Sequence, residues 1–257
     1  SFPQSIVHYL PVTDHDERWG IVCTTAGYQN VPPGSPYPLT QHPDSYSFTR
    51  SRGRVLGEYQ LLYIVSGQGE FRSASSPAAP VKAGTVVMLF PDEWHTYAPD
   101  PETGWEEWWV GFRGENIDRR VAEGFFSPKT PLLHIGHSAG IVSCYQEIIR
   151  SAEEERKGFQ QLVTGIVLHL LGSVLFKRDN LQYLDNPIVE KINRAREMMR
   201  RHIGDNLPPE EIARRLNIGY TWFRRTFRAY VGIAPAQYQL QLRHNKAREL
   251  LTTTDRT

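Results

Sequence analysis

Short apolar runs separated by turn residues fill the first half of the chain. Residues 59–65 form such a run, and the Ser-Gly-Gln-Gly sequence at 66–69 after it is a turn signal. Two further runs occupy residues 84–90 and 108–112, with dense proline and glycine between the runs. Several short strands joined by such turns are typical of a β-sandwich or a β-barrel, so the pattern predicts one of these folds.

After about residue 137 the apolar spacing becomes helical. The first predicted helix carries its apolar stripe at Ile141, Cys144, Tyr145, Ile148, Ile149 and Ala152. A second helix is expected over about 159–177, with its richest apolar face at Leu162, Ile166, His169, Leu170 and Val174. Residues 181–186 form a predicted linker, after which Asn186 and Pro187 suit the N-cap and the first turn of a new helix.

Residues 187–257 have a helical pattern, and two of the expected helices have helix-turn-helix spacing. Residues 208–216 predict a short helix, residues 217–220 a turn, and residues 221–230 a second helix. The exposed side of this second helix is predicted to hold Tyr220, Thr221, Arg224, Arg225 and Arg228. Arginine pairs with guanine edges and a threonine methyl contacts thymine, so the pattern favours DNA binding. The alternative is a helical hairpin whose basic face is merely solvated.

The charge distribution favours a polyanion partner for this last segment. The chain has a net charge of +1, but residues 187–257 carry 14 Lys or Arg against 7 Asp or Glu, whereas residues 1–186 carry 15 against 21. A basic segment on an acidic body is typical of nucleic-acid binding. The two cysteines exclude a disulfide scaffold and zinc sites built on several thiolates.

Three patterns in the last segment carry a resemblance to a known family. They are Phe223-Arg-Arg-Thr-Phe227, Gly232-Ile-Ala-Pro-Ala-Gln-Tyr238, and Arg243 followed by Ala247, Leu250 and Leu251. These resemble the DNA-binding domain of AraC-type (AraC/XylS family) regulators, and the resemblance implies that Tyr220, Thr221, Arg224 and Arg225 read bases. The family has a second helix-turn-helix after the long helix, whereas this chain ends at Thr257. We therefore expect residues 187–257 to hold the first half of an apparently truncated domain.

Residues 53–69, 83–97 and 104–112 resemble the cupin-like sensor domain of the same family. The resemblance implies an α+β protein with a cupin-like β-barrel (jelly roll) and an N-terminal arm in residues 1–136. It further implies a helical dimerisation segment in residues 137–180, for which simple packing on the barrel is the alternative. In the family's best-known members the arm, here roughly residues 1–18, couples ligand binding to DNA binding.

Tryptophans mark a candidate ligand site in the predicted barrel. Strand alternation places Trp105, Glu107 and Trp109 on one face. An aromatic surface beside a carboxylate suits a sugar, because rings stack on C–H groups and carboxylates accept bonds from hydroxyls; the alternative is ordinary tryptophan packing. The family resemblance implies ligand contacts at positions matching Arg52 or Arg54, Tyr97, Glu107 and Trp109.

A metal-dependent cupin enzyme, an isomerase or oxygenase fused to a helical module, is one alternative function. A mononuclear cupin site uses about three histidines and a glutamate. His95 matches the position of the last such histidine, but no histidine lies between His42 and His95. We therefore expect no metal, no cofactor and no catalytic residue, and we place His95 in the ligand pocket. Another alternative is a ligand-independent dimeric DNA-binding protein.

Together these features predict a ligand-responsive transcription regulator. We expect it to bind double-stranded DNA, to form a homodimer, and to sense a small molecule, for which a carbohydrate is the best candidate. The longest apolar stretch, residues 162–176, is too short to span a bilayer comfortably, and no signal peptide is visible. We expect a cytoplasmic protein without a membrane partner.

Overall fold

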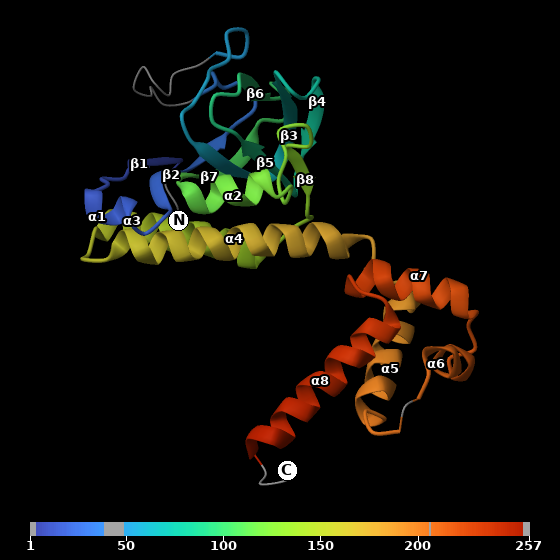
Figure 1. Cartoon of the computed structure of the whole chain (residues 1–257). Coiled ribbons are helices and arrows are strands. Elements are labelled where there is room, and N and C mark those ends of the chain that lie inside the picture. Colours follow the sequence, from blue (N-terminus) through green and yellow to red (C-terminus); the bar gives the residue numbers. More distant parts are fainter. Residues whose placement is uncertain (1–3, 39–48, 206, 254–257) are drawn as a thin grey trace. The chain divides into compact units, whose positions relative to one another are not determined.

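The computed structural model describes residues 4–38, 49–205 and 207–253 (Figure 1). Contacts within the chain divide it into two units, Ser1–Leu181 and Gln182–Thr257. In the described part, every strand belongs to the first unit. Residues 1–3 of the predicted N-terminal arm lie outside the described residues.

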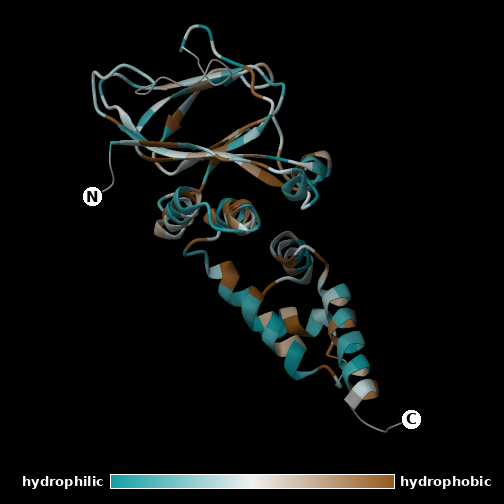
Figure 2. Cartoon of the chain, turned by 90° about the vertical axis from the view of Figure 1, so that its left-hand side faces the viewer, coloured by the Kyte–Doolittle hydropathy of each residue, from teal (hydrophilic) through white to brown (hydrophobic). Residues whose placement is uncertain are grey.

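An antiparallel sheet forms the body of the first unit. The hydrogen-bonded order is β1 (Ser5–Tyr9), β2 (Val22–Val31), β7 (Trp105–Arg113), β3 (Tyr59–Ser73), β5 (Thr85–Leu89) and β8 (Leu132–His134). The second half of the long β3 also pairs with β4 (Ala79–Lys82) and β6 (His95–Pro99). The strands lie in two layers that curve around one interior (Figure 2), as the β-barrel prediction requires. Two short helices, α1 (Asp14–Glu17) and α2 (Glu115–Ala122), lie between strands in the sequence.

The central strands of this sheet are buried on both faces. On β7, Trp108 and Val110 belong to an apolar cluster shared with the helices, whereas Trp105 and Trp109 belong to a second cluster inside the barrel. β3 pairs with β7 so that Leu62 lies opposite Trp109, and the side chains of the two strands point to the same face at each paired position. Because successive side chains on a strand point to opposite faces, each central strand contributes to both clusters.

Two helices, α3 (Ala139–Glu154) and α4 (Phe159–Leu181), pack against each other and against β2 of the sheet (Figure 1). The Ser138 hydroxyl caps α3 by accepting the backbone N–H of Ile141 at 3.3 Å. The predicted apolar stripe of α3 is buried except for Cys144, which is half-buried.

The predicted apolar face of α4 is wrong in part. Leu162 and His169 are exposed. The residues that the structure buries include Val163, Val167, Leu170, Leu171 and Val174. The helix is apolar on nearly all sides, so hydrophobic periodicity could not identify the side that packs.

α4 is also longer than predicted, since the sequence indicated a helix over about residues 159–177 and the structure extends it to Leu181. α4 is 23 residues long, and in the described part of the chain it is the one helix long and apolar enough to cross a membrane. Core helices of soluble proteins meet the same criterion, and α4 packs on α3 and β2. Its composition is therefore weak evidence for a membrane span.

One buried amide joins α4 to the sheet. The Oε1 atom of Gln160 accepts the backbone N–H of Cys23 at 2.9 Å. Its Nε2 atom donates to the carbonyl of Cys23 at 2.8 Å and to that of Pro11 at 3.0 Å. Cys23 lies in β2 and Pro11 follows β1, so one side chain holds two neighbouring segments. Because the amide is fully hydrogen-bonded, its burial avoids the cost of an unpaired polar group.

The described residues of the second unit form the helices α5 (Pro187–Arg201), α6 (Pro209–Arg215), α7 (Tyr220–Val231) and α8 (Pro235–Thr253). Asn186 caps α5 as predicted, since its side chain accepts the N–H of Ile188. Asn217, in the turn between α6 and α7, has a φ of 53°, a left-handed conformation that asparagine tolerates. The core includes Ile192, Ala195, Met199, Ile212, Ala213, Phe223 and Phe227.

Candidate functional site

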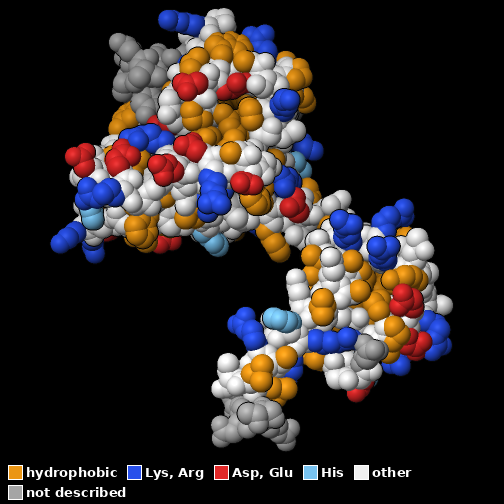
Figure 3. Space-filling model, in the orientation of Figure 1, with side chains coloured by type: hydrophobic (Ala, Val, Ile, Leu, Met, Phe, Trp, Pro, Cys, Tyr) orange, Lys and Arg blue, Asp and Glu red, His pale blue; other side chains and the backbone are white. Residues whose placement is uncertain are grey.

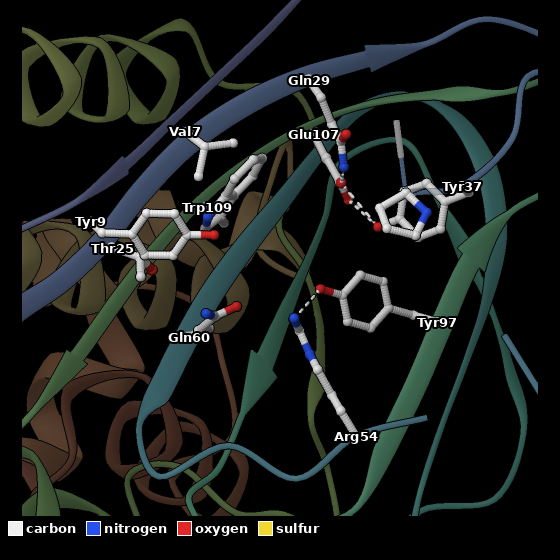
Figure 4. Close-up of a pocket in the computed structure, with 11 residues that line it drawn as sticks. Val7, Tyr9, Thr25, Gln29, Tyr37, Arg54, Gln60, Tyr97, Glu107 and Trp109 are labelled. Carbon is white, nitrogen blue, oxygen red and sulfur yellow. Dashed lines mark hydrogen bonds between the residues drawn. The ribbon is translucent and has the colours of Figure 1, made fainter. Parts of the chain in front are cut away.

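A cavity lies inside the barrel of the first unit (Figure 4). In the present arrangement its lining side chains leave free space of about 20 Å³, roughly enough for one water molecule, so a larger ligand requires some of these side chains to move. Aromatic, polar and charged side chains line it together: Val7, Tyr9, Thr25, Gln29, Tyr37, Pro38, Arg54, Gln60, Tyr97, Glu107 and Trp109. Strands β1, β2, β3, β6 and β7 supply most of them. Concave sites that mix apolar walls with a few polar groups are typical of small-molecule binding.

Strand register and one glycine shape the wall of the cavity. β2 and β7 pair so that Gln29 lies opposite Glu107 and Gly27 lies opposite Trp109. A Cβ atom at position 27 would lie 2.1 Å from the Cζ2 atom of Trp109. Only glycine at position 27 therefore leaves room for the indole in this position.

Glu107 is a fully buried carboxyl group in this wall. The Nε2 atom of Gln29 donates to its Oε1 atom. The hydroxyl of Tyr37 lies 3.0 Å from Oε1 and 3.2 Å from Oε2. Burial raises the pKa of Glu107 to about 7, although these two hydrogen bonds and the charge of Arg54 act in the opposite direction. The group thus lies near its titration point at neutral pH.

Arg54 lies on another side of the cavity, held by two neighbours. Its Nε atom donates to Nε2 of His95 at 3.2 Å, and its Nη2 atom donates to the Tyr97 hydroxyl at 2.8 Å. Nδ1 of His95 lies 3.1 Å from the carbonyl of Glu93, which assigns the ring proton to Nδ1. Burial, and then the charge of Arg54, lower the pKa of His95 to about 3, so the imidazole is neutral.

The structure places four of the six predicted ligand residues in the cavity wall. These are Arg54, Tyr97, Glu107 and Trp109. His95 contacts Arg54 instead of lining the cavity, so it acts on the site by orienting the guanidinium. Arg52 is exposed, and its carbonyl accepts a hydrogen bond from Nε1 of Trp94 at 3.1 Å. Of the two arginines that the sequence left as alternatives, Arg54 is the one that reaches the cavity.

Several residues that line the cavity were not predicted from the sequence. Thr25 and Gln29 of β2, and Gln60 of β3, are polar residues on the inward face of largely buried strands. They could have been predicted from polar residues that lie an even number of positions apart in a strand and therefore share one face. Tyr37 lies in a segment without periodic pattern, so no local signal pointed to it.

Metal binding was an open alternative for this barrel. Within the described residues, no group of three or more histidine, cysteine, aspartate or glutamate side chains is arranged to hold a metal ion. Both ring nitrogens of His95 have protein partners, Arg54 and the Glu93 carbonyl. Both ring nitrogens of this histidine are therefore used in hydrogen bonds in this structure, one of them to the arginine.

The second unit presents the predicted polar surface on α7. Phe223 and Phe227 are fully buried, with ring centroids 5.5 Å apart. The opposite side exposes Thr221, Arg224, Arg225 and Arg228, while Tyr220 is half-buried. Trp222 is also exposed, so it does not pack inward. Figure 3 shows Lys and Arg side chains gathered over α7. The helix thus has the amphipathic form that a recognition helix requires.

Comparisons with known proteins place these features in a family. The family described as "AraC-like ligand binding domain" matches residues 33–171. The Msm operon regulatory protein of Streptococcus mutans is 22% identical over 200 residues, which cover 77% of this chain and 71% of that protein. The raffinose operon transcriptional regulatory protein RafR of Pediococcus pentosaceus is 21% identical over 221 residues, covering 81% and 76%. The crystal structure of the AraC-like transcriptional activator CuxR covers 98% of this chain and 87% of CuxR, with 14% identity and a TM-score of 0.32.

The family match spans more than half of the chain, from the segment after β2 to the middle of α4. The chain therefore belongs to the AraC-like ligand binding domain family, as the sequence resemblance implied. It is a ligand-responsive transcription regulator with a cupin-like barrel followed by helices, which confirms the expected class.

The buried carboxyl group generates a prediction about pH. The folded-state pKa of Glu107 is raised from 4.5 to about 7, so its contribution to stability is fully present below about pH 4.5 and is lost as pH rises through 7. The loss amounts to roughly 3 kcal/mol. Urea denaturation at pH 5 and pH 8, followed by tryptophan fluorescence, should show this loss in the wild type and not in Glu107→Gln. His95 titrates in both proteins, so its contribution cancels in the comparison. Equal pH dependence of the two proteins would contradict the prediction.

Proposed function

We propose that this regulator senses a sugar in the barrel cavity. The observation that carries the proposal is the indole of Trp109 beside the buried carboxyl group of Glu107. An indole face stacks on the C–H groups of a sugar ring, and the carboxyl group accepts hydrogen bonds from hydroxyls. One relative is named for the operon of raffinose, a sugar. That the curated relatives are regulatory proteins supports a binding role for the cavity rather than a catalytic one.

A thermal-shift screen with monosaccharides and disaccharides tests the sugar proposal. A ligand at 100 times its dissociation constant stabilises the protein by about 2.7 kcal/mol, which raises Tm by roughly 5–10 °C. We expect one or more sugars to give such a shift, and Trp109→Ala to abolish it. Trp94→Ala, which changes a tryptophan outside the cavity lining, is the matched control and should retain the shift. A shift that survives in Trp109→Ala would contradict the proposed stacking.

We further propose that each segment of the chain has a function of its own. Residues 1–136 bind the ligand, residues 137–180 dimerise, and residues 187–257 bind DNA beyond the linker at 181–186. Val7 and Tyr9 of β1 line the cavity, which supports coupling through the predicted arm. A protein that regulates transcription works in the compartment that holds the DNA, which supports a cytoplasmic location.

The proposed DNA contacts are those on α7. Arg224, Arg225 and Arg228 are exposed on the side opposite the buried phenylalanines, with Tyr220 and Thr221 at the N-terminal end of the helix. In helix-turn-helix proteins the N-terminal residues of the second helix contact base edges. We therefore assign base contacts to Tyr220, Thr221, Arg224 and Arg225. Arg228, one turn further along, is assigned to the phosphate backbone.

Fluorescence anisotropy with a duplex selected by the wild-type chain from a random library tests these contacts. We expect Arg224→Ala and Arg225→Ala each to weaken binding roughly 10- to 100-fold, because a bidentate arginine–guanine pair is worth about 1–3 kcal/mol. Arg194→Ala on α5, whose arginine pairs with Glu190, is the control and should change affinity less than threefold. Equal losses for all three variants would refute the assignment to α7.

A second copy of this chain is the proposed partner of the outer face of α4. Exposed residues recur there at spacings of three and four: Leu162, Gly165, His169, Gly172 and Phe176. Leu162 is 51% exposed and Phe176 is 68% exposed. This spacing is that of a coiled-coil seam, and the two glycines allow close approach of another helix. The stripe holds no carboxylate, lysine or arginine that would oppose a matching stripe.

Analytical ultracentrifugation tests this dimer. Leu162→Glu and Phe176→Glu place charges in the proposed seam, so we expect each to raise the dimer dissociation constant at least tenfold. Leu184→Glu changes a leucine outside α4 that is at least as exposed as Leu162, and it should leave the dimer intact. A monomeric wild type, or equal effects of the three substitutions, would contradict the proposed seam.

A further inference from the structure

We infer that Tyr37 is a gate for the barrel cavity. Its ring closes the cavity in this structure, and it rotates into a groove beside the turn between β6 and β7 to admit a ligand. The inference goes beyond the proposed function, because it assigns the route of entry for a ligand of any class. Three features of the described residues carry it: the small free space in the cavity, the place of Tyr37 between cavity and groove, and its position outside the paired strands.

The cavity is closed in this structure, because its lining leaves free space of only about 20 Å³. Eight of the eleven lining residues lie in the paired strands β1, β2, β3, β6 and β7, and a ninth, Arg54, forms a β-bridge with His95. Backbone hydrogen bonds fix the positions of these nine. The other two are Tyr37 and Pro38, and proline has no side chain that rotates freely. Tyr37 is therefore the residue best placed to make way for a ligand.

Tyr37 separates the cavity from a second space, here called the outer groove. Proline rings form much of the groove's wall, and two charged residues add polar groups: Pro32, Pro99, Pro101, Arg50 and Asp100. The outer groove has free space of about 200 Å³, ten times that of the cavity. Tyr37 is the one described residue that lines both spaces. Rotation of its side chain thus moves the ring out of the cavity and into a space that can hold it.

Three contacts hold the ring in the closed position. The hydroxyl of Tyr37 lies 3.0 Å from Oε1 and 3.2 Å from Oε2 of Glu107 (Figure 4). The ring lies edge-to-face with Trp105, at a centroid distance of 5.8 Å, and with Tyr97, at 6.2 Å. Aromatic pairs prefer such geometry, so the closed state is favoured. All three contacts are made by the side chain, so rotation of the side chain alone breaks them.

The chain on either side of Tyr37 suits this role. Pro36 and Pro38 flank it, and neither has a backbone N–H with which to join a sheet. Gly34 fastens the segment close by, since its N–H donates to the carbonyl of Pro101 at 2.8 Å. The backbone thus keeps Tyr37 at the border of the two spaces, while no strand ladder restricts its side chain.

Labelling of a cysteine inside the cavity tests the gate without a known ligand. The reporter is Thr25→Cys, which replaces a lining side chain that is 1% exposed, in a Cys144→Ala background. The other native cysteine, Cys23, is fully buried in the core. The probe is methyl methanethiosulfonate. When closing is faster than labelling, the rate measures the population of the open state.

Two substitutions act on the two positions of the ring. Tyr37→Phe keeps the ring and removes its hydrogen bond to Glu107, so we expect labelling about tenfold faster than in the wild type. A residue that only filled space would leave this rate unchanged. Ser35→Trp fills the outer groove, which Ser35 lines, so we expect labelling at least threefold slower. Phe125→Ala removes an exposed aromatic side chain that lines neither space, and as the control it should label at the wild-type rate.

Three outcomes would overturn the gate. The first is a rate that neither Tyr37→Phe nor Ser35→Trp changes. The second is a rate that responds to Tyr9→Ala alone, because the entrance would then lie at β1. The third is a rate that follows the free energy of global unfolding, measured by urea denaturation of each variant, because the reagent would then enter by unfolding. None of these outcomes depends on the thermal-shift screen, so the gate and the sugar proposal stand or fall separately.

Discussion

Side-chain alternation along β7 is the constraint on which the first unit depends. Trp108 and Val110 complete the core shared with α3 and α4, while Glu107 and Trp109 occupy the intervening positions and line the cavity. A slip of one residue would exchange the two faces, placing a carboxyl group against the helices and an aliphatic side chain in the binding wall. The apolar contacts with the helices therefore fix the register that positions the polar groups. Packing outside the barrel sets the geometry inside it.

Polar groups are tolerated in the interior of the barrel because they form hydrogen bonds with one another. His95 remains neutral and accepts from Arg54, and Tyr97 accepts from the same guanidinium. Glu107 receives bonds from Gln29 and Tyr37. Buried charges without such partners would be expensive. The arrangement leaves the arginine rigid, so a ligand meets a preorganised donor and does not have to order it.

Much of this organisation could be predicted from the sequence, for identifiable reasons. The two-residue period of β7 placed Glu107 and Trp109 together, and the spacing around Asn217 indicated the helix-turn-helix. Two features lay beyond such reasoning. Tyr37 reaches Glu107 from a segment without regular period, so its contact depends on tertiary structure alone. The buried side of α4 was misjudged because a helix that is apolar on nearly all sides carries no directional pattern.

The amide of Gln160 links the strands that line the cavity to the helix proposed to meet a second subunit. It contacts only main-chain atoms at Pro11 and Cys23. These hydrogen bonds therefore do not depend on the side chains at the two positions, although Cys23 is itself buried in the core shared with the helices. The cavity-lining residues Thr25 and Gln29 of β2 take no part in this joint, so related proteins can change this wall for new effectors while keeping the same attachment to α4. The attachment depends on the positions of backbone atoms, so it does not constrain the side chains that recognise the ligand.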